Sequence, residues 1–206
     1  MIKPAALLSL FAMGLAGTAF AADLEQGKAS FEVCAACHGA DGAGSNELNA
    51  PSIAGMPAWY SVRQLQNFKS GARGTNSKDM YGTQMRPMAM TLADDAAMEN
   101  VAAYIETLKA PKPAATVKGD LAKGKAAFAT CAACHAPDGS GMQALNAPPL
   151  TGQYDWYIER QLLAYKNGWR GTDAKDTYGL QMRPMAMTLA TDEAVRDVAA
   201  YIATLD

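Results

Sequence analysis

Apolar residues recur at helical spacing in the first part of each half of the chain. The stretches Leu24 to Cys37 and Leu121 to Cys134 are helix-prone, and the apolar stripe of the first includes Phe31 and Val33. Side chains three or four residues apart lie on one face of an α-helix, so both stretches predict amphipathic helices. The chain shows no convincing alternation of apolar and polar residues of the kind that predicts strands. The predicted fold class is therefore all-α.

Two further helices are predicted in each half. The middle one spans Trp59 to Lys69 in the first half. The last one starts at Asp94 in the first half and at Thr191 in the second, because both side chains can cap a helix N-terminus. It ends near Leu108 and Leu205. The inward residues predicted for the first half include Tyr60, Leu65, Phe68, Val101, Tyr104, Ile105 and Leu108.

Two segments between the predicted helices lack this periodicity. Residues Gly39 to Pro57 are rich in Gly, Asn, Ser and Pro, which favours a loop. Residues Ala72 to Ala93 combine glycines with Pro87 and three methionines, and we expect irregular structure there.

The second half of the chain repeats the first without a gap. A shift of 97 residues superposes the two, which predicts two tandem domains, residues 23–110 and 119–206. Residues 111–118 between them contain two prolines and predict a short, rather stiff linker. The matched pairs include Gly27 and Gly124, Phe31 and Phe128, Trp59 and Trp156, Arg63 and Arg160, Gly71 and Gly168, Tyr81 and Tyr178, Met85 and Met182, and Tyr104 and Tyr201.

The N-terminus has the pattern of a secretory signal peptide. Lys3 precedes an apolar run from Ala5 to Phe20, and small residues follow at Ala21 and Ala22. Residues 1–22 are therefore expected to direct the protein to the periplasm and to be removed. An uncut membrane anchor is the alternative. No later run is long and apolar enough to span a bilayer, although peripheral association with the membrane stays open.

Charge excludes one class of partner. The chain has 18 basic and 20 acidic side chains, a net charge of −2. It has no basic stripe or polybasic tail, so nucleic acid is not an expected partner.

The pattern Cys-x-x-Cys-His occurs twice and uses every cysteine and histidine of the chain. Two cysteines three residues apart lie on one side of a helical turn, where both sulfurs can bond to one haem edge. The next histidine can then bind the iron, so the pattern predicts two covalently attached haems c. The residues concerned are Cys34, Cys37 and His38 in the first domain and Cys131, Cys134 and His135 in the second.

Three other uses of these cysteines fit the sequence less well. A zinc site usually has its two cysteine pairs roughly 15–20 residues apart, whereas here they are 97 apart. A thioredoxin-like redox pair needs a strand-helix context and no histidine. A disulfide within Cys-x-x-Cys is possible in an oxidising compartment but would restrain the unfolded chain little.

The second axial ligand of each iron is expected to be a methionine, since both histidines are already used. The candidates lie in Gln84 to Met90 and in its identical copy, Gln181 to Met187. Of these we expect Met85 and Met182, with Met88 and Met185 next. A neutral thioether favours ferrous iron and so raises the reduction potential. Cu(I) binding and ordinary packing are the alternatives for the remaining methionines.

Other residues are candidates for supporting contacts around each haem. The carbonyls of Pro51 and Pro148 could accept a hydrogen bond from the histidine Nδ1–H and fix the ring. Guanidinium and indole groups could bind the haem propionates, and a solvated surface charge is the alternative for each arginine. These candidates are Trp59, Arg63, Arg73, Trp156, Arg160 and Arg170.

Together these motifs resemble the cytochrome c4 family, periplasmic diheme cytochromes built from two class I cytochrome c domains. The resemblance covers the whole mature chain. It includes the segments Pro51 to Gly55 and Tyr60 to Arg73, and the closing Val-Ala-Ala-Tyr-Ile helices. It places Met85 and Met182 where the family has its iron ligands. It also implies two haems facing each other across a pseudo-twofold interface.

The resemblance further implies a carrier of electrons from a quinol-oxidising complex or a dehydrogenase to a terminal haem-copper oxidase. We expect no enzyme activity and no dedicated small-molecule substrate, because both iron faces would be occupied and no general base is evident. The identical stretch Gln84 to Leu92 in both copies argues against a large difference in potential between the haems. The alternative function is the diheme subunit of a dehydrogenase such as a flavocytochrome sulfide dehydrogenase.

Overall fold

A computed structural model describes residues 21–205 of the chain. The signal peptide expected at residues 1–22 therefore lies outside the described residues, except for its last two positions. None of the helices within the described range is long and apolar enough to cross a membrane.

The described residues form α-helices joined by loops, with one short 3₁₀-helix, η1, and two isolated β-bridges in place of strands. The predicted all-α class is confirmed. The first half contains α1 (Leu24–His38), α2 (Ala58–Lys69), α3 (Met80–Met90) and α4 (Asp95–Thr107). The second half contains α5 (Leu121–His135), η1 (Gln143–Leu145), α6 (Asp155–Lys166), α7 (Thr177–Met187) and α8 (Asp192–Ile202).

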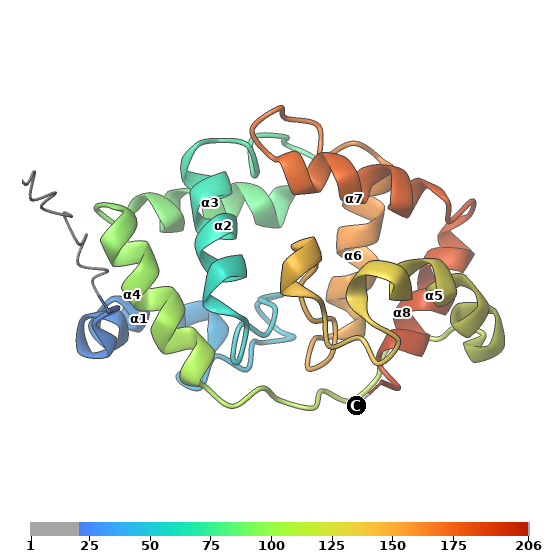
Figure 1. Cartoon of the computed structure of the whole chain (residues 1–206), viewed down its shortest axis with the longest axis horizontal. Coiled ribbons are helices and arrows are strands. Elements are labelled where there is room, and N and C mark those ends of the chain that lie inside the picture. The colour runs from blue at the N-terminus through green and yellow to red at the C-terminus, as the bar shows by residue number, and fades with distance from the viewer. Residues whose placement is uncertain (1–20, 206) are drawn as a thin grey trace, which may run out of the picture.

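The two halves lie side by side and repeat one arrangement (Figure 1). Helices α1 and α4 pack together at one end of the molecule, and α5 and α8 pack together at the other. Helices α2 and α6 lie nearer the centre, and the segment between α4 and α5 runs along one edge. The inner helices therefore place their side chains near the boundary between the halves.

The outer helices of each half can approach closely because a glycine lies at the crossing point. A Cβ atom at Gly27 would lie 2.1 Å from the carbonyl oxygen of Asn100 on α4. A Cβ atom at Gly124 would lie equally close, at 2.1 Å, to that of Asp197 on α8. Phe31 and its counterpart in α5 are then buried in the two cores. Val33, expected on the same inward stripe, is 43% exposed but lines the cavity that the two halves share.

The last helix of each half starts where the sequence predicts. The carboxylate of Asp94 accepts the Ala97 N–H at 2.9 Å, and the hydroxyl of Thr191 accepts the Ala194 N–H at 3.1 Å. These are the side-chain caps expected of both residues. Helix α8 ends at Ile202 instead of near Leu205, because the final residues form tighter i to i+3 bonds.

The methionine segments are helical, so the expected irregular structure is wrong there. Asp79 caps α3 and accepts the Gly82 N–H at 3.1 Å. Asp176 caps α7 in the same way, accepting the Gly179 N–H at 2.9 Å. Each helix then continues through an internal proline. The prediction gave weight to the proline, which removes one backbone donor, and overlooked the aspartate caps.

The linker is fastened to the second domain by one buried carboxylate. Asp155, at the start of α6, is 2% exposed. It accepts hydrogen bonds from the Thr116 N–H, the Val117 N–H and the Thr116 hydroxyl. The linker's path is therefore set by this contact as well as by its prolines. The equivalent position in the first domain is Ala58, so the fold accepts alanine there.

Replacing Asp155 by alanine is expected to release the linker. Three backbone N–H groups, those of Thr116, Val117 and Trp156, lose their acceptor, at a cost of about 1–3 kcal/mol for each group left unsatisfied. Trypsin should then cleave faster after Lys118, while the bond after Lys112 is protected by Pro113. Asp173→Ala is the matched control, since that carboxylate also accepts a backbone N–H, from Lys175, away from the linker. Equal cleavage rates in the two variants would show that the Asp155 hydrogen bonds do not hold the linker in place.

Candidate haem sites

Each predicted iron-binding histidine ends the first helix of its half and is held by a hydrogen bond. His38 Nδ1 lies 2.9 Å from the Pro51 carbonyl oxygen, and His135 Nδ1 lies 2.8 Å from that of Pro148. This confirms the contacts expected for both prolines. A carbonyl only accepts, so Nδ1 carries the proton and Nε2 keeps its lone pair. Burial lowers the pKa of both imidazoles and keeps them neutral, the form that binds a metal.

The four cysteines are free thiols, so the disulfide alternative is not supported. In each pair the first cysteine is half-buried and the second is exposed. Burial raises the pKa of the Cys34 and Cys131 thiols, so both are protonated at neutral pH. No three His, Cys, Asp or Glu side chains gather into a metal site among residues 21–205. The zinc alternative is therefore also unsupported.

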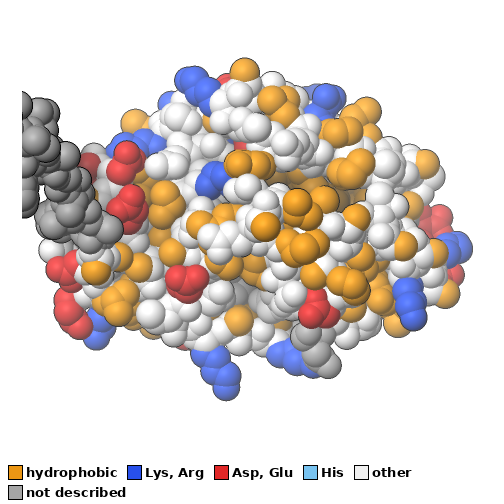
Figure 2. Space-filling model, viewed as in Figure 1, with side chains coloured by type: hydrophobic (Ala, Val, Ile, Leu, Met, Phe, Trp, Pro, Cys, Tyr) orange, Lys and Arg blue, Asp and Glu red, His pale blue; other side chains and the backbone are white. Residues whose placement is uncertain are grey.

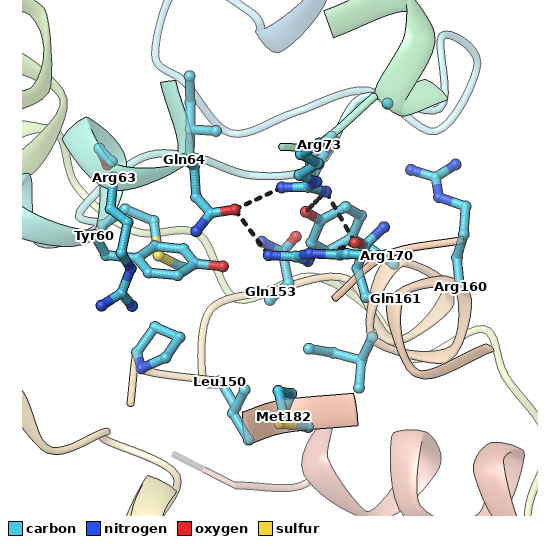
Figure 3. Close-up of a pocket in the computed structure, with 18 of the residues that line it drawn as sticks. Tyr60, Arg63, Gln64, Arg73, Leu150, Gln153, Arg160, Gln161, Arg170 and Met182 are labelled. Carbon is cyan, nitrogen blue, oxygen red and sulfur yellow. Dashed lines mark hydrogen bonds between the residues drawn. The ribbon is translucent and has the colours of Figure 1, made fainter. Parts of the chain in front are cut away.

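One cavity connects the two cysteine-histidine motifs. Both histidines line it, and so do all four cysteines, Cys34, Cys37, Cys131 and Cys134. Most of its other walls are apolar side chains from both halves, and Figure 3 shows part of it between α2, α6 and α7. The fold thus places two sites 97 residues apart in sequence along one shared space.

The cavity narrows the choice among the methionines. Met85 and Met88 line it in the first half, and Met182 and Met185 line it in the second. Met90 is 54% exposed and Met187 is 53% exposed. Because α3 and α7 are helical, core packing is a real competitor for the methionines, and Met182 does pack against the second core. The assignment of Met85 and Met182 as ligands stays a prediction.

Two buried arginines join the halves through two glutamines. Arg73 donates to Gln64 Oε1 and Gln161 Oε1, both at 2.9 Å. Arg170 donates to the same two oxygens, at 2.8 Å to Gln64 and 2.6 Å to Gln161. The four side chains form a closed ring across the boundary, drawn with dashed lines in Figure 3. Since Arg73 is 6% exposed and Arg170 is 4% exposed, the surface-charge alternative is wrong for both.

A second pair of arginines crosses the boundary in opposite directions. Arg63 donates to the side chain and the carbonyl of Asn146, at 3.0 and 2.9 Å, and its guanidinium lies 4.3 Å from the Tyr178 ring centre. Arg160 donates to the carbonyl of Asn49, the counterpart of Asn146, at 2.9 Å. Its guanidinium lies 4.1 Å from the Tyr81 ring centre. The reciprocity is that of a pseudo-twofold axis. Trp156 instead donates its indole N–H to Asn46.

The residues present fit the predicted haems. The cavity is mainly apolar, and each histidine offers a neutral nitrogen. Four guanidiniums line it, and the Nε atoms of all four are buried without a hydrogen-bond partner. None of the ion pairs among the described residues involves these arginines. Buried guanidiniums without a carboxylate suit anionic haem propionates, although that role stays a prediction. The four are Arg63, Arg73, Arg160 and Arg170.

The sequence did not predict the polar residues that accept hydrogen bonds from these arginines. Gln64 and Gln161 occupy equivalent positions in the two copies, and so do Asn49 and Asn146. An amide retained at the same position of both copies was a usable signal. Each of these residues also accepts a hydrogen bond from an arginine of the opposite copy, however, and no spacing within one domain reveals that.

Comparison with known proteins agrees with this geometry. The sequence profile of the cytochrome c family matches residues 24–109 and again residues 121–206. A thiosulfate dehydrogenase electron acceptor of Stutzerimonas stutzeri (strain A1501) is 37% identical over 84% of this chain and 78% of its own length. Cytochrome c4 of Stutzerimonas stutzeri is 33% identical over 94% of both chains.

A solved structure has the same architecture. The crystal structure of reduced recombinant cytochrome c4 from Pseudomonas stutzeri matches with a TM-score of 0.71 and 28% identity, over 90% of this chain and all 100% of the other.

Replacing Arg170 by methionine is expected to weaken the contact between the halves. The change breaks the ring of four hydrogen-bonded side chains and should lower the free energy of unfolding by about 1–3 kcal/mol. Guanidinium-induced unfolding of the haem-loaded protein measures this. Arg73→Met should cost a similar amount, because the ring is reciprocal. Arg196→Met, at an exposed position of α8, is the control. A loss no larger than the control's would argue against the ring.

Proposed function

The chain belongs to the cytochrome c family as a two-domain, diheme member of the cytochrome c4 type, and we propose that it carries electrons in the periplasm from a dehydrogenase or quinol-oxidising complex to a terminal oxidase. Electron transfer by two covalently attached haems follows from the family. What we propose beyond this is the compartment, the electron donor and the electron acceptor.

The observation that carries the proposal is the cavity shared by the two cysteine-histidine motifs. A carrier with two independent haems would need no common space between its domains. Here reciprocal arginine contacts hold the domains so that both sites border one cavity. This supports a unit that loads and releases two electrons, one at each site.

The proposed site residues have separate tasks. Cys34, Cys37, Cys131 and Cys134 would attach the two haems through thioether bonds. His38 and Met85 would bind the first iron, and His135 and Met182 the second. Each haem iron, when bound, accepts or releases one electron. The neutral imidazoles are ready to bind iron because their Nδ1 protons are held by proline carbonyls.

A carrier role is favoured over catalysis. With a histidine and a methionine on opposite iron faces, no coordination position would stay open for a substrate. The histidines are used as ligands and are buried, so neither can serve as a general base. The cysteines would be consumed by attachment.

Periplasmic location is supported by the N-terminal sequence pattern and by the chemistry of the site. Bacteria complete covalent haem c attachment on the periplasmic side of the inner membrane. The net charge of −2 gives no reason to expect strong binding to anionic lipid.

The thiosulfate dehydrogenase electron acceptor relative supports a dehydrogenase as the donor. We propose a thiosulfate dehydrogenase as the first donor to test, and a haem-copper oxidase as the acceptor. The alternative is a permanent diheme subunit of a dehydrogenase, such as a flavocytochrome sulfide dehydrogenase. Figure 2 shows apolar side chains across the middle of one face, with charged ones mostly towards its rim. Such a face suits contact with another protein.

Replacing Met85 by alanine is expected to abolish the low-spin His/Met spectrum at one haem only. The methionine-to-iron band near the red end of the oxidised spectrum should fall by about half, since one of two thioether ligands is lost. Met182→Ala should do the same at the other haem.

Met88→Ala and Met185→Ala are the matched controls for the ligand assignment, because both residues line the same cavity. Their spectra should keep the full band. A full band in Met85→Ala together with a halved band in Met88→Ala would reverse the assignment.

Rapid-mixing kinetics test the donor. The oxidised protein should be reduced within milliseconds to seconds by thiosulfate dehydrogenase plus thiosulfate, and not by thiosulfate alone. It should also elute alone in size-exclusion chromatography of native periplasm. Elution with a flavoprotein in fixed ratio would favour the subunit alternative, and no reduction would exclude this donor.

A further inference from the structure

The two copies differ at the loop that holds the iron-binding histidine. One backbone hydrogen bond beside this point is the same in both loops. Ile53 N–H donates to the Gly42 carbonyl at 2.9 Å, and the equivalent Leu150 N–H donates to the Gly139 carbonyl at 2.8 Å. The residue after the histidine's carbonyl partner, however, is Ser52 in the first copy and Pro149 in the second. The second loop therefore lacks the backbone N–H that the first loop has at Ser52.

Gln153 of the second domain fastens this position in the first domain. Its side-chain oxygen accepts the Ser52 N–H at 3.1 Å, and its side-chain nitrogen donates to the Ser52 carbonyl at 2.8 Å. Ser52 is 2% exposed and Gln153 is 8% exposed, so water does not substitute easily for either bond. Ser52 directly follows Pro51, the carbonyl partner of His38. A side chain from one domain thus restrains the backbone that orients the histidine of the other.

The second copy has no such restraint across the boundary. The side chain of Met56, the counterpart of Gln153, has no N–H donor, and Pro149 has no backbone N–H to donate. The loop there is stiffened within its own backbone, because Pro148 and Pro149 both fix φ. The same mechanical task is performed by two prolines in one copy and by a cross-domain amide in the other.

We propose that Gln153 is a positioning residue for the first haem: by pinning Ser52 it holds the Pro51 carbonyl against His38 and makes the properties of that haem depend on the docked second domain. The inference rests on the proposed role of His38 as an iron ligand. No equivalent dependence exists in the other direction at this loop.

The expected consequence is a one-sided effect on reduction potential. A firm Nδ1–H···O=C bond makes the imidazole a stronger donor to iron, which stabilises ferric iron. If the Ser52 backbone is released, the Pro51 carbonyl moves more freely and the bond to His38 weakens. The midpoint potential of the first haem should then rise, while that of the second should not change.

Gln153→Met tests this, because methionine is the residue that the other copy has at the equivalent position. In the haem-loaded protein, NMR-monitored redox titration should show an upward shift of the first haem only. The axial histidine resonances distinguish the two haems, since Met85→Ala perturbs only one set. The His38 Nδ1–H should also exchange faster with solvent than in the unchanged protein. Gln143→Met, an exposed glutamine of η1, is the control.

Ser52→Pro in the Gln153→Met background tests the mechanism. The double variant has proline at position 52 and methionine at position 153, as the other copy has at the equivalent Pro149 and Met56. The lost hydrogen bonds are therefore replaced by a proline that fixes the loop backbone. The potential of the first haem and the exchange rate of His38 Nδ1–H should both return towards their original values. Gln153→Glu keeps the acceptor for the Ser52 N–H but loses the donor, and should shift the potential less. It also serves if Gln153→Met does not load haem.

Three results would overturn the proposal: no shift in the first haem, equal shifts in both haems, or a shift that Ser52→Pro does not reverse. Equal shifts would mean general loosening of the domain contact. Failure of the proposed function itself looks different. In that case the unchanged protein would already lack two His/Met haem spectra, before any substitution at Gln153 is made.

Discussion

Buried guanidiniums that donate across the boundary between two small domains are the contacts on which the rest of this structure depends. A charged group in a nearly dry interior is costly unless its N–H groups find acceptors. Arg73 and Arg170 find theirs in the two glutamines that they share. The closed ring fixes how the domains meet, and both haem sites border one cavity only because of that fixed arrangement.

Gene duplication explains the reciprocity of the interface, and small departures from it give the two sites different surroundings. Helices α3 and α7, which carry the proposed methionine ligands, share an identical stretch, which would give both haems the same thioether ligation. The differences lie instead where the domains touch. Asn67 donates to the buried carboxylate of Asp176 at 3.0 Å, while Ala164 stands at the position equivalent to Asn67. The contact with Gln153 is one-sided in the same way. Two nearly equal sites can thus be made unequal by the interface.

Local patterns predicted most of the helices, and the errors have identifiable causes. The capping residues Asp94 and Thr191 act where they were expected, because a cap involves only neighbouring residues. The methionine segments were expected to be irregular, since glycine and proline usually break helices. The segments are helical nevertheless, because Asp79 and Asp176 cap the N-termini of α3 and α7.

By itself, the sequence determined the covalent chemistry: two haem attachment motifs, two histidines with a candidate proline carbonyl for each, and a duplicated all-α domain. These features depend on residues close together in the chain, so spacing is enough to find them. Only the tertiary structure decided which residues connect the copies. The partners of Arg73, Ser52 and the linker lie 88, 101 and 39 residues away, and contacts at such separations are set by how packed surfaces meet.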